Sequence, residues 1–130
     1  MRKRGWCTIG WDVSSEGRPR GTVVSPEFRA ELFARSFDAV LCREVLEHAP
    51  NPQGLLRELY QVTAAGGVCE ITTPRPMDNP KIDDPVCVCY HWAHLCLRSV
   101  DALSTELLRV GFLIEEKTIW EFDQRYLCRR

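Results

Sequence analysis

The stretch from residue 37 to residue 74 constrains the fold of this chain more than any other part of it. It opens with a short apolar run, FDAVLC over residues 37–42, whose length and residue types are typical of a β-strand. From Gln53 onward, apolar residues recur at helical spacing, which predicts a helix with one buried face at positions 55, 56, 59, 60 and 62. A second apolar run over residues 68–73 predicts another strand, ended by Pro74.

Strand, helix and strand in this order form a βαβ unit, whose two strands lie parallel and are joined by a right-handed crossover. We expect Gly66-Gly67 to end the helix, because glycine adopts a left-handed backbone at little cost. Polar residues, Arg43-Glu44 and Glu47-His48, follow the first strand. They therefore fall at the carboxyl edge of the sheet, where open α/β sheets bind their ligands.

The segments FDAVLCREVLEH, NPQGLLRELYQVTAAGG and ITTP occur in this order within residues 37–74. Together they resemble the middle of class I S-adenosylmethionine-dependent methyltransferases, in the group with an EVLEH signature after the fourth strand. The resemblance implies an α/β fold, a partial Rossmann-like and doubly wound sheet with mostly parallel strands. It also implies an enzyme that transfers a methyl group from S-adenosylmethionine, without indicating the acceptor.

Composition limits the classes of function that remain. A chain of 130 residues forms one domain at most, and a net charge of −1 with scattered Lys and Arg gives no surface for nucleic acid. No apolar run approaches about 18 residues, so we expect no membrane span, and no secretory signal is recognisable. We therefore expect a cytoplasmic protein whose seven cysteines are reduced, with Cys42 and Cys69 as small core residues.

One short segment carries a candidate cofactor residue. GWDVSSE, residues 10–16, resembles the end of the second strand of the family, where an acidic residue holds the ribose hydroxyls of the cofactor. Asp12 is the matching acid, and a carboxylate suits the task because it accepts two hydrogen bonds from a vicinal diol. An equally good interpretation is that Asp12 begins a turn. Cys42 and Arg43 lie where the resemblance places the cofactor beside the acceptor.

The glycine-rich cofactor loop of the family has no counterpart before Asp12, since Gly5 and Gly10 do not form one. We therefore expect residues 1–130 to form a single, incomplete methyltransferase-like domain. One hypothesis is an enzyme whose cofactor loop comes from a partner chain or from an unusual substitute. The other is a degenerate, non-catalytic relative that acts as an interaction module. A truncated sheet exposes strand edges, which predicts an oligomer or a partner chain that completes it.

Glu44 and His48 are the candidate catalytic residues, because methyl transfer needs positioning and sometimes a base. Their spacing would place Glu44 on one helical face with Glu47 or His48. Two carboxylates and an imidazole also suit a divalent metal. In some relatives with an E-x-x-E-H pattern a metal orients the accepting hydroxyl, and by this resemblance Glu44, Glu47, His48 and His91 (or His94) would be the ligands. Helix packing and capping explain the same residues without a metal.

The remaining segments predict simpler structure. Thr22-Val23-Val24 is a candidate strand, and the proline-rich residues 74–85 form a loop. Cys87, Cys89, His91, His94 and Cys96 either hold a structural zinc or belong to a half-buried strand. Ser99 caps a helix that runs to about residue 110 and buries four apolar side chains (Leu103, Leu107, Leu108 and Val110). A strand follows from Phe112 toward Phe122, and no convincing final strand is visible in residues 123–130.

Overall fold

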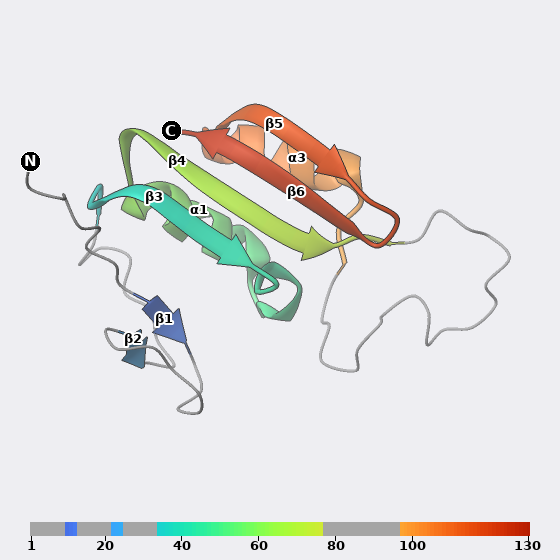
Figure 1. Ribbon diagram of the computed structural model, residues 1–130, viewed down its shortest axis with the longest axis horizontal. Helices are drawn as coiled ribbons and strands as arrows, with labels where there is room; N and C mark the ends of the chain where they lie inside the picture. Colours follow the sequence, from blue (N-terminus) through green and yellow to red (C-terminus); the bar gives the residue numbers. More distant parts are fainter. Residues whose placement is uncertain (1–9, 13–21, 25–33, 77–96) are drawn as a thin grey trace, which may run out of the picture.

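The computed structural model describes residues 10–12, 22–24, 34–76 and 97–130. Its elements are β1 (Gly10–Asp12), β2 (Thr22–Val24), β3 (Phe37–Arg43), the 3-10 helix η2 (Leu46–His48), α1 (Pro52–Val62), β4 (Thr63–Pro74), α3 (Val100–Val110), β5 (Leu113–Ile119) and β6 (Asp123–Arg129). Strands β1 and β2 pair in parallel, and the other four form a sheet in the order β3-β4-β6-β5 (Figure 1).

The four-stranded sheet contains the βαβ unit that the sequence predicts. Strands β3 and β4 are parallel and α1 connects them, whereas β6 is antiparallel to both β4 and β5. Helices α1 and α3 lie side by side on one face of this sheet (Figure 1). The predicted α/β class is therefore confirmed, with a mixed sheet in the described part of the chain.

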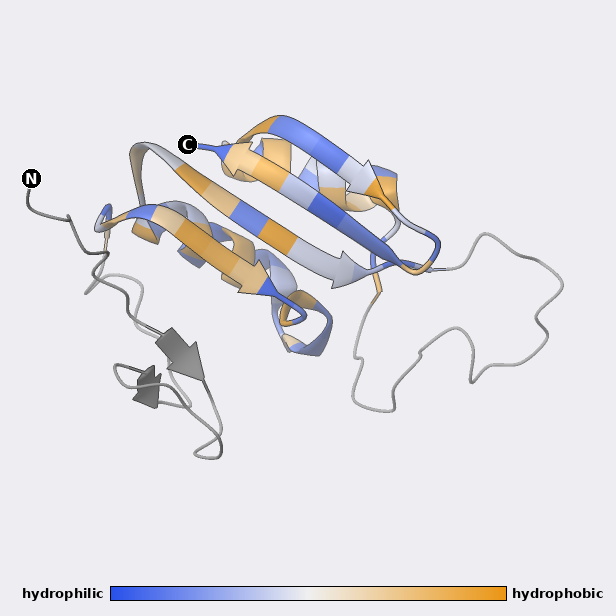
Figure 2. Cartoon of the chain, in the orientation of Figure 1, coloured by the Kyte–Doolittle hydropathy of each residue, from blue (hydrophilic) through white to orange (hydrophobic). Residues whose placement is uncertain are grey.

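The core lies between that face of the sheet and the two helices. Alternate residues of β6 and of the second half of β4 are buried in it, and Figure 2 shows β3 as a mostly hydrophobic strand beside them. Its fully buried side chains include Leu56, Cys69, Ile71, Leu103, Leu107, Tyr126 and Cys128. Burial of each leucine or isoleucine contributes about 1.5–3 kcal/mol to folding. Tyr60 of α1 meets Phe112 edge to face, with ring centroids 5.1 Å apart.

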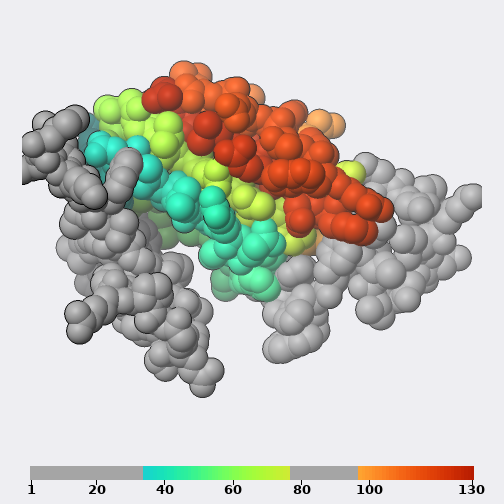
Figure 3. Space-filling view, in the orientation of Figure 1, coloured from blue at the N-terminus to red at the C-terminus, as the bar shows by residue number. Residues whose placement is uncertain are grey.

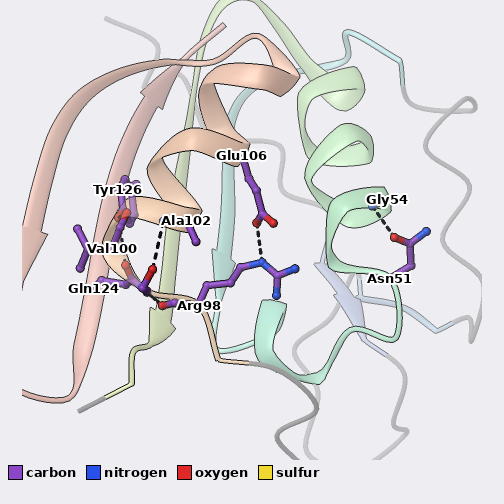
Figure 4. A network of polar contacts seen from close by, with 9 residues as sticks. Asn51, Gly54, Arg98, Val100, Ala102, Glu106, Gln124 and Tyr126 are labelled. Atoms are coloured by element: carbon purple, nitrogen blue, oxygen red, sulfur yellow. Dashed lines mark hydrogen bonds and ion pairs between the residues drawn. The ribbon is translucent and has the colours of Figure 1, made fainter. Parts of the chain in front are cut away.

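Helix α1 begins as expected and ends earlier than expected. Asn51 accepts a hydrogen bond from the Gly54 backbone N–H at 3.0 Å, which caps the start (Figure 4). The predicted stop at Gly66-Gly67 is wrong, because Thr63 already has an extended backbone and its hydroxyl donates to the carbonyl of Leu59. The glycines lie inside β4, where its pairing with β3 jumps from Thr63 to Val68.

Helix α3 has the predicted ends. Ser99 Oγ accepts from the Ala102 N–H at 3.2 Å, and Gly111 ends the helix with a left-handed backbone at φ 114°. Leu103 and Leu107 are buried as expected, whereas Leu108 is 56% exposed, so that part of the prediction is wrong. Leu108 follows Leu107 by about 100° around the helix, which turns its side chain away from the sheet.

Strand β6 corrects the expectation that residues 123–130 contain no convincing strand. It pairs with β4 along its whole length and forms a hairpin with β5. Its start is fixed to α3, since Gln124 Nε2 donates to the carbonyl of Arg98 at 2.6 Å and Tyr126 Oη donates to that of Val100 (Figure 4). These bonds hold the beginning of β6, and with it the hairpin, against the rest of the fold.

The second face of the sheet carries no helix in the described part of the chain, and Figure 3 shows it directly. A row of alternating charges crosses all four strands on this face. Arg43 of β3 pairs with Glu70 of β4 at 2.6 Å, and Glu70 pairs with Arg125 of β6 at 2.8 Å. Arg125 also lies 3.7 Å from Glu116 of β5. The row ties the strands together where no helix packs on them.

Candidate functional site

Glu44 stands where β3 ends, and its backbone is in the left-handed region at φ 53°. This conformation is sterically costly for a residue with a side chain, and such outliers concentrate at functional sites. The Glu44 N–H donates to the carbonyl of Thr72 at 2.9 Å, which fixes the turn to β4. The carboxylate is therefore held at the carboxyl edge of two parallel strands.

Glu47 and His48 lie in η2, directly after this turn. The Glu47 side chain is 1% exposed, and its Oε2 accepts a hydrogen bond of 2.9 Å from Thr73 Oγ1. Among the described residues, nothing donates a hydrogen bond to its Oε1, although His48 Nε2 lies 3.6 Å away. The His48 side chain is 40% exposed. A surface imidazole thus stands beside a buried carboxylate.

Partial burial and the charges at this edge make Glu44 a better proton acceptor than an ordinary glutamate. Partial burial raises the pKa of its carboxyl, and the negative charges of Glu47 and Asp123 raise it further, against the opposite effect of His48. A carboxyl whose pKa moves toward the working pH accepts a proton more readily in a transition state.

The structure brings the candidate catalytic residues together by a turn and not by a shared helical face. Glu44 precedes η2, so the expectation that it lies on one helix with Glu47 and His48 is wrong. The Cys42 side chain is buried in the core, where burial raises the pKa of its thiol to about 12 and keeps it neutral. Arg43 points to the open face, in its ion pair with Glu70.

The other candidate residues are placed less completely. Asp12 is the last residue of β1 and pairs in register with Val24 of β2, so it stands at the carboxyl end of a parallel strand. His91 lies outside the described residues, as do the cysteines and histidines of residues 87–96. In the described ranges, no group of three or more His, Cys, Asp or Glu side chains is arranged to hold a metal ion. Glu44, Glu47 and His48 alone therefore do not make the expected metal site.

Two residues at this edge, Thr73 and Asp123, were not predicted from the sequence. Thr73 precedes Pro74, which marks the end of the strand, so this proline was a usable signal for a side chain at the same edge. Asp123 begins β6, and its position beside the site had no signal because the strand itself was not recognised.

A family model described as a methyltransferase domain matches residues 1–117. The chain belongs to this methyltransferase family. It is 40% identical over 96 residues to the ubiquinone biosynthesis O-methyltransferase of Psychrobacter cryohalolentis. This match covers 62% of this chain and 37% of that protein. The protein of the same name from Pseudomonas putida is 39% identical over 58 residues, which cover 45% of this chain and 24% of the relative. The chain thus spans well under half the length of these relatives.

Solved structures support the fold of this chain. An S-adenosylmethionine-dependent methyltransferase from Mesorhizobium loti matches with a TM-score of 0.69 at 17% identity, over 94% of this chain and 80% of that one. A second S-adenosylmethionine-dependent methyltransferase, from Archaeoglobus fulgidus, matches with a TM-score of 0.70 at 16% identity, over 94% of this chain and 75% of that one. The partial Rossmann-like fold expected from the sequence is confirmed. Within the residues that the structure describes, no helix is long and apolar enough to cross a membrane.

Proposed function

We propose that this methyltransferase domain transfers a methyl group from S-adenosylmethionine to a hydroxyl oxygen of its acceptor, at the carboxyl edge of β3 and β4. The observation that carries the proposal is Glu44, a carboxylate with a left-handed backbone and a raised pKa at that edge. The choice of oxygen rests on the two relatives, whose names describe O-methyltransferases.

The residues present fit the cofactor in part. Asp12 ends a parallel strand with a carboxylate, the group that suits the two ribose hydroxyls. The backbone at Cys42 and Arg43 would lie beside the cofactor, because the side chain of Cys42 is in the core and that of Arg43 is paired with Glu70. When bound, S-adenosylmethionine supplies an electrophilic methyl group on a sulfonium.

Glu44 acts as the base in this proposal. Asp12 and the backbone at Cys42 and Arg43 would hold S-adenosylmethionine, which would supply the methyl group to the acceptor oxygen and keep the carbon–sulfur electron pair on its sulfur. The hydroxyl proton passes to the Glu44 carboxylate and from there to water. His48 lies beside Glu47 at the same edge, with its Nε2 3.6 Å from Glu47 Oε1 and its side chain 40% exposed.

The test is methyl transfer from radiolabelled S-adenosylmethionine to catechol by the wild type, Glu44→Gln and Asp38→Asn. Asp38 is the matched control, because it is an exposed carboxylate on the same strand at the opposite edge. We expect Glu44→Gln to lower kcat about a hundredfold and to flatten the acidic limb of the pH profile. Asp38→Asn should have the kcat and pH profile of the wild type. A Glu44→Gln variant with an unchanged kcat would refute the role of Glu44 as the base.

A metal-assisted version of the same reaction is the second candidate. The buried Glu47 Oε1, with no hydrogen-bond donor among the described residues, favours a cation near it. Removal of metal with a chelator, followed by addition of Mg²⁺, tests this candidate. Loss of methyl transfer on chelation and its recovery with Mg²⁺ would support the metal, whereas unchanged methyl transfer would refute it.

A domain that binds no cofactor would instead be the non-catalytic interaction module. An oligomer or partner chain would add at β3, which ends the described four-stranded sheet.

A further inference from the structure

The open face of the four-stranded sheet, which Figure 3 shows, carries a row of charges whose signs alternate. From β3 to β5 the row consists of Arg43, Glu70, Arg125 and Glu116. The side chains of Glu70 and Arg125, in the middle of the row, are 12% and 30% exposed. Arg43 and Glu116, at its ends, are each 62% exposed. The row therefore presents a positive charge to solvent at one end and a negative charge at the other.

The same face carries the two most exposed large apolar side chains in the described part of the chain. Leu41 of β3 is 65% exposed, and Leu113 of β5 is 64% exposed. Leu41 is in register with Glu70, and Leu113 with Arg129. Residues in register share a face of the sheet, and the neighbours of Glu70 and Arg129 along their strands are the ones that face the core. Both leucines therefore lie on the open face, on its two outer strands.

The row of charges is complementary to itself. A second copy placed face down, related by a two-fold axis parallel to the strands, brings its β5 over β3 and its β6 over β4. Glu116 of that copy then meets Arg43, and Arg125 of that copy meets Glu70. Such reciprocal contacts are those of a two-fold symmetric interface. A two-fold axis across the strands would instead place each strand over its own counterpart and oppose like charges, so the charges select the first orientation.

The first orientation also brings the leucines together. Registers join Leu113 through Arg129 and Val68 to Ala39. Leu113 of one copy therefore comes over Ala39, two residues from Leu41 of the other copy. Four strands about 4.8 Å apart, each about seven residues long, give a flat face of about 400 Å². This area is on the order of half of what each partner buries in a stable complex, so the contact should be weak.

We propose that the open face binds a second copy of this chain, face to face, in a two-fold symmetric dimer. The charges set the orientation of the copies more than their affinity, because pairing across the interface has to offset the loss of water around each charge. The leucines supply apolar area that is removed from water. Because the axis runs along the strands, the carboxyl ends of β3 and β4 lie at the same end of the dimer in both copies, and the interface leaves that edge uncovered.

Sedimentation velocity of the 130-residue chain, at about 1 to about 200 μM, tests the dimer. The wild type should dimerise with a Kd of about 10–100 μM. Arg43→Glu and Glu116→Arg each oppose like charges across the interface, so each should raise Kd about tenfold or more. The double variant restores opposite signs between copies while it places like charges side by side within each copy. Its Kd should return to within about threefold of the wild type, which is a signature of pairing between copies.

Two control variants change side chains that lie off the open face. Lys117→Glu reverses a charge on β5 whose register partner, Tyr126, faces the core, and Leu108→Ser removes an exposed leucine from α3. Both should keep the wild-type Kd, whereas Leu41→Ser should raise it about threefold or more. Raising NaCl from about 0.05 to about 0.5 M should weaken the wild-type dimer by screening, a result that requires no variant to fold.

A wild type that stays monomeric at about 200 μM would overturn the inference. Single charge reversals that leave Kd unchanged would also overturn it, since a dimer of that kind would pair elsewhere, for example at the edge of β3. A double variant that is folded by circular dichroism and does not recover the wild-type Kd would show that Arg43 and Glu116 do not meet between copies.

Discussion

Thr73 Oγ1 donates a hydrogen bond of 2.9 Å to Oε2 of Glu47, which joins the end of β4 to the 3-10 helix that follows β3. Both side chains are almost completely buried, at 2% and 1% exposure. A buried carboxylate depends on such a donor, because a buried polar group without a partner costs about 1–3 kcal/mol. This bond therefore fixes the carboxylate beneath the candidate site.

Thr73→Val removes the donor while keeping the shape of the side chain. We expect it to lower the free energy of unfolding by about 2 kcal/mol, measured by urea denaturation. Thr72→Val is the matched control, since Thr72 is the neighbouring threonine on β4 and is only half-buried on the opposite face. It should change stability by less than about 0.5 kcal/mol. Equal effects of the two substitutions would show that the bond to Glu47 is not stabilising.

Arg130 completes the C-terminus of α1. Its Nη1 donates to the carbonyls of Tyr60, Gln61 and Thr63 at 2.6, 3.0 and 2.7 Å, and its guanidinium lies 4.3 Å from the Tyr60 ring centroid. Arg130→Ala should cost about 1–2 kcal/mol in the free energy of unfolding, because these helix-end carbonyls lose a charged donor.

Arg109→Ala is the comparison for Arg130, because Arg109 is an exposed arginine in the last turn of α3. Its loss should cost about 0.5 kcal/mol or less, from the helix dipole alone. Thermal unfolding of the two variants measures this difference. An Arg130→Ala variant that is as stable as Arg109→Ala, or more stable, would contradict the prediction.

Gly111 and Gly66 test two different reasons for a glycine. Both have a positive φ, 114° and 75°, but a Cβ on Gly111 would meet the Tyr60 ring at 3.0 Å, whereas one on Gly66 would meet nothing within 4 Å. Gly66→Ala should therefore cost about 1 kcal/mol from backbone strain alone, and Gly111→Ala should cost more. Chemical denaturation that ranks them in the opposite order would contradict the packing of Gly111 against Tyr60.

Three buried thiols predict how stability depends on alkaline pH. Cys42, Cys69 and Cys128 face the core from β3, β4 and β6. Cys69 lies opposite Cys128 in the register of β4 and β6, and all three are free thiols. Burial raises the pKa of Cys42 and Cys128 from 9.0 to about 12, and it also raises that of Cys69. The unfolded thiols ionise near 9.0 while the folded ones stay neutral, so their contribution is complete below that pH and is lost above it.

Each of these thiols should lower the free energy of unfolding by about 1.4 kcal/mol per pH unit in this alkaline range. Urea denaturation at about pH 9 and about pH 11 would measure the slope for the wild type and for Cys128→Ala. We expect the variant to lose about one thiol's share of the slope. Identical slopes would mean that Cys128 ionises equally well in the folded and unfolded states.

The sequence was informative where local signals agree with one another. The apolar runs and the helical spacing within residues 37–74 predicted the parallel βαβ unit, and Ser99 predicted the start of α3. These signals succeed because strand bias, helix caps and apolar periodicity depend on neighbouring residues. The gathering of Glu44, Glu47 and His48 at a carboxyl edge followed from the same unit.

The features that the sequence did not predict depend mainly on packing between distant segments. Strand β6 reads as DQRYLCR, and its inward positions alternate as expected for a strand, but two of them, Gln124 and Tyr126, are polar. Their burial is explained by bonds to α3 that no local pattern contains. The early end of α1 likewise depends on Arg130, 68 residues after Val62 in the chain. The left-handed turn at Glu44 has no sequence signal, since glutamate rarely adopts it.

Calorimetric titration with S-adenosylmethionine tests the central claim most directly, since every proposal for this edge requires the cofactor to bind there. The wild type should bind in the micromolar range, and Asp12→Ala should weaken binding about tenfold or more through loss of the ribose contact. Asp38→Ala, at the opposite edge of β3, should leave the affinity unchanged. No binding by the wild type at millimolar cofactor, or equal affinities in Asp12→Ala and the wild type, would contradict the account.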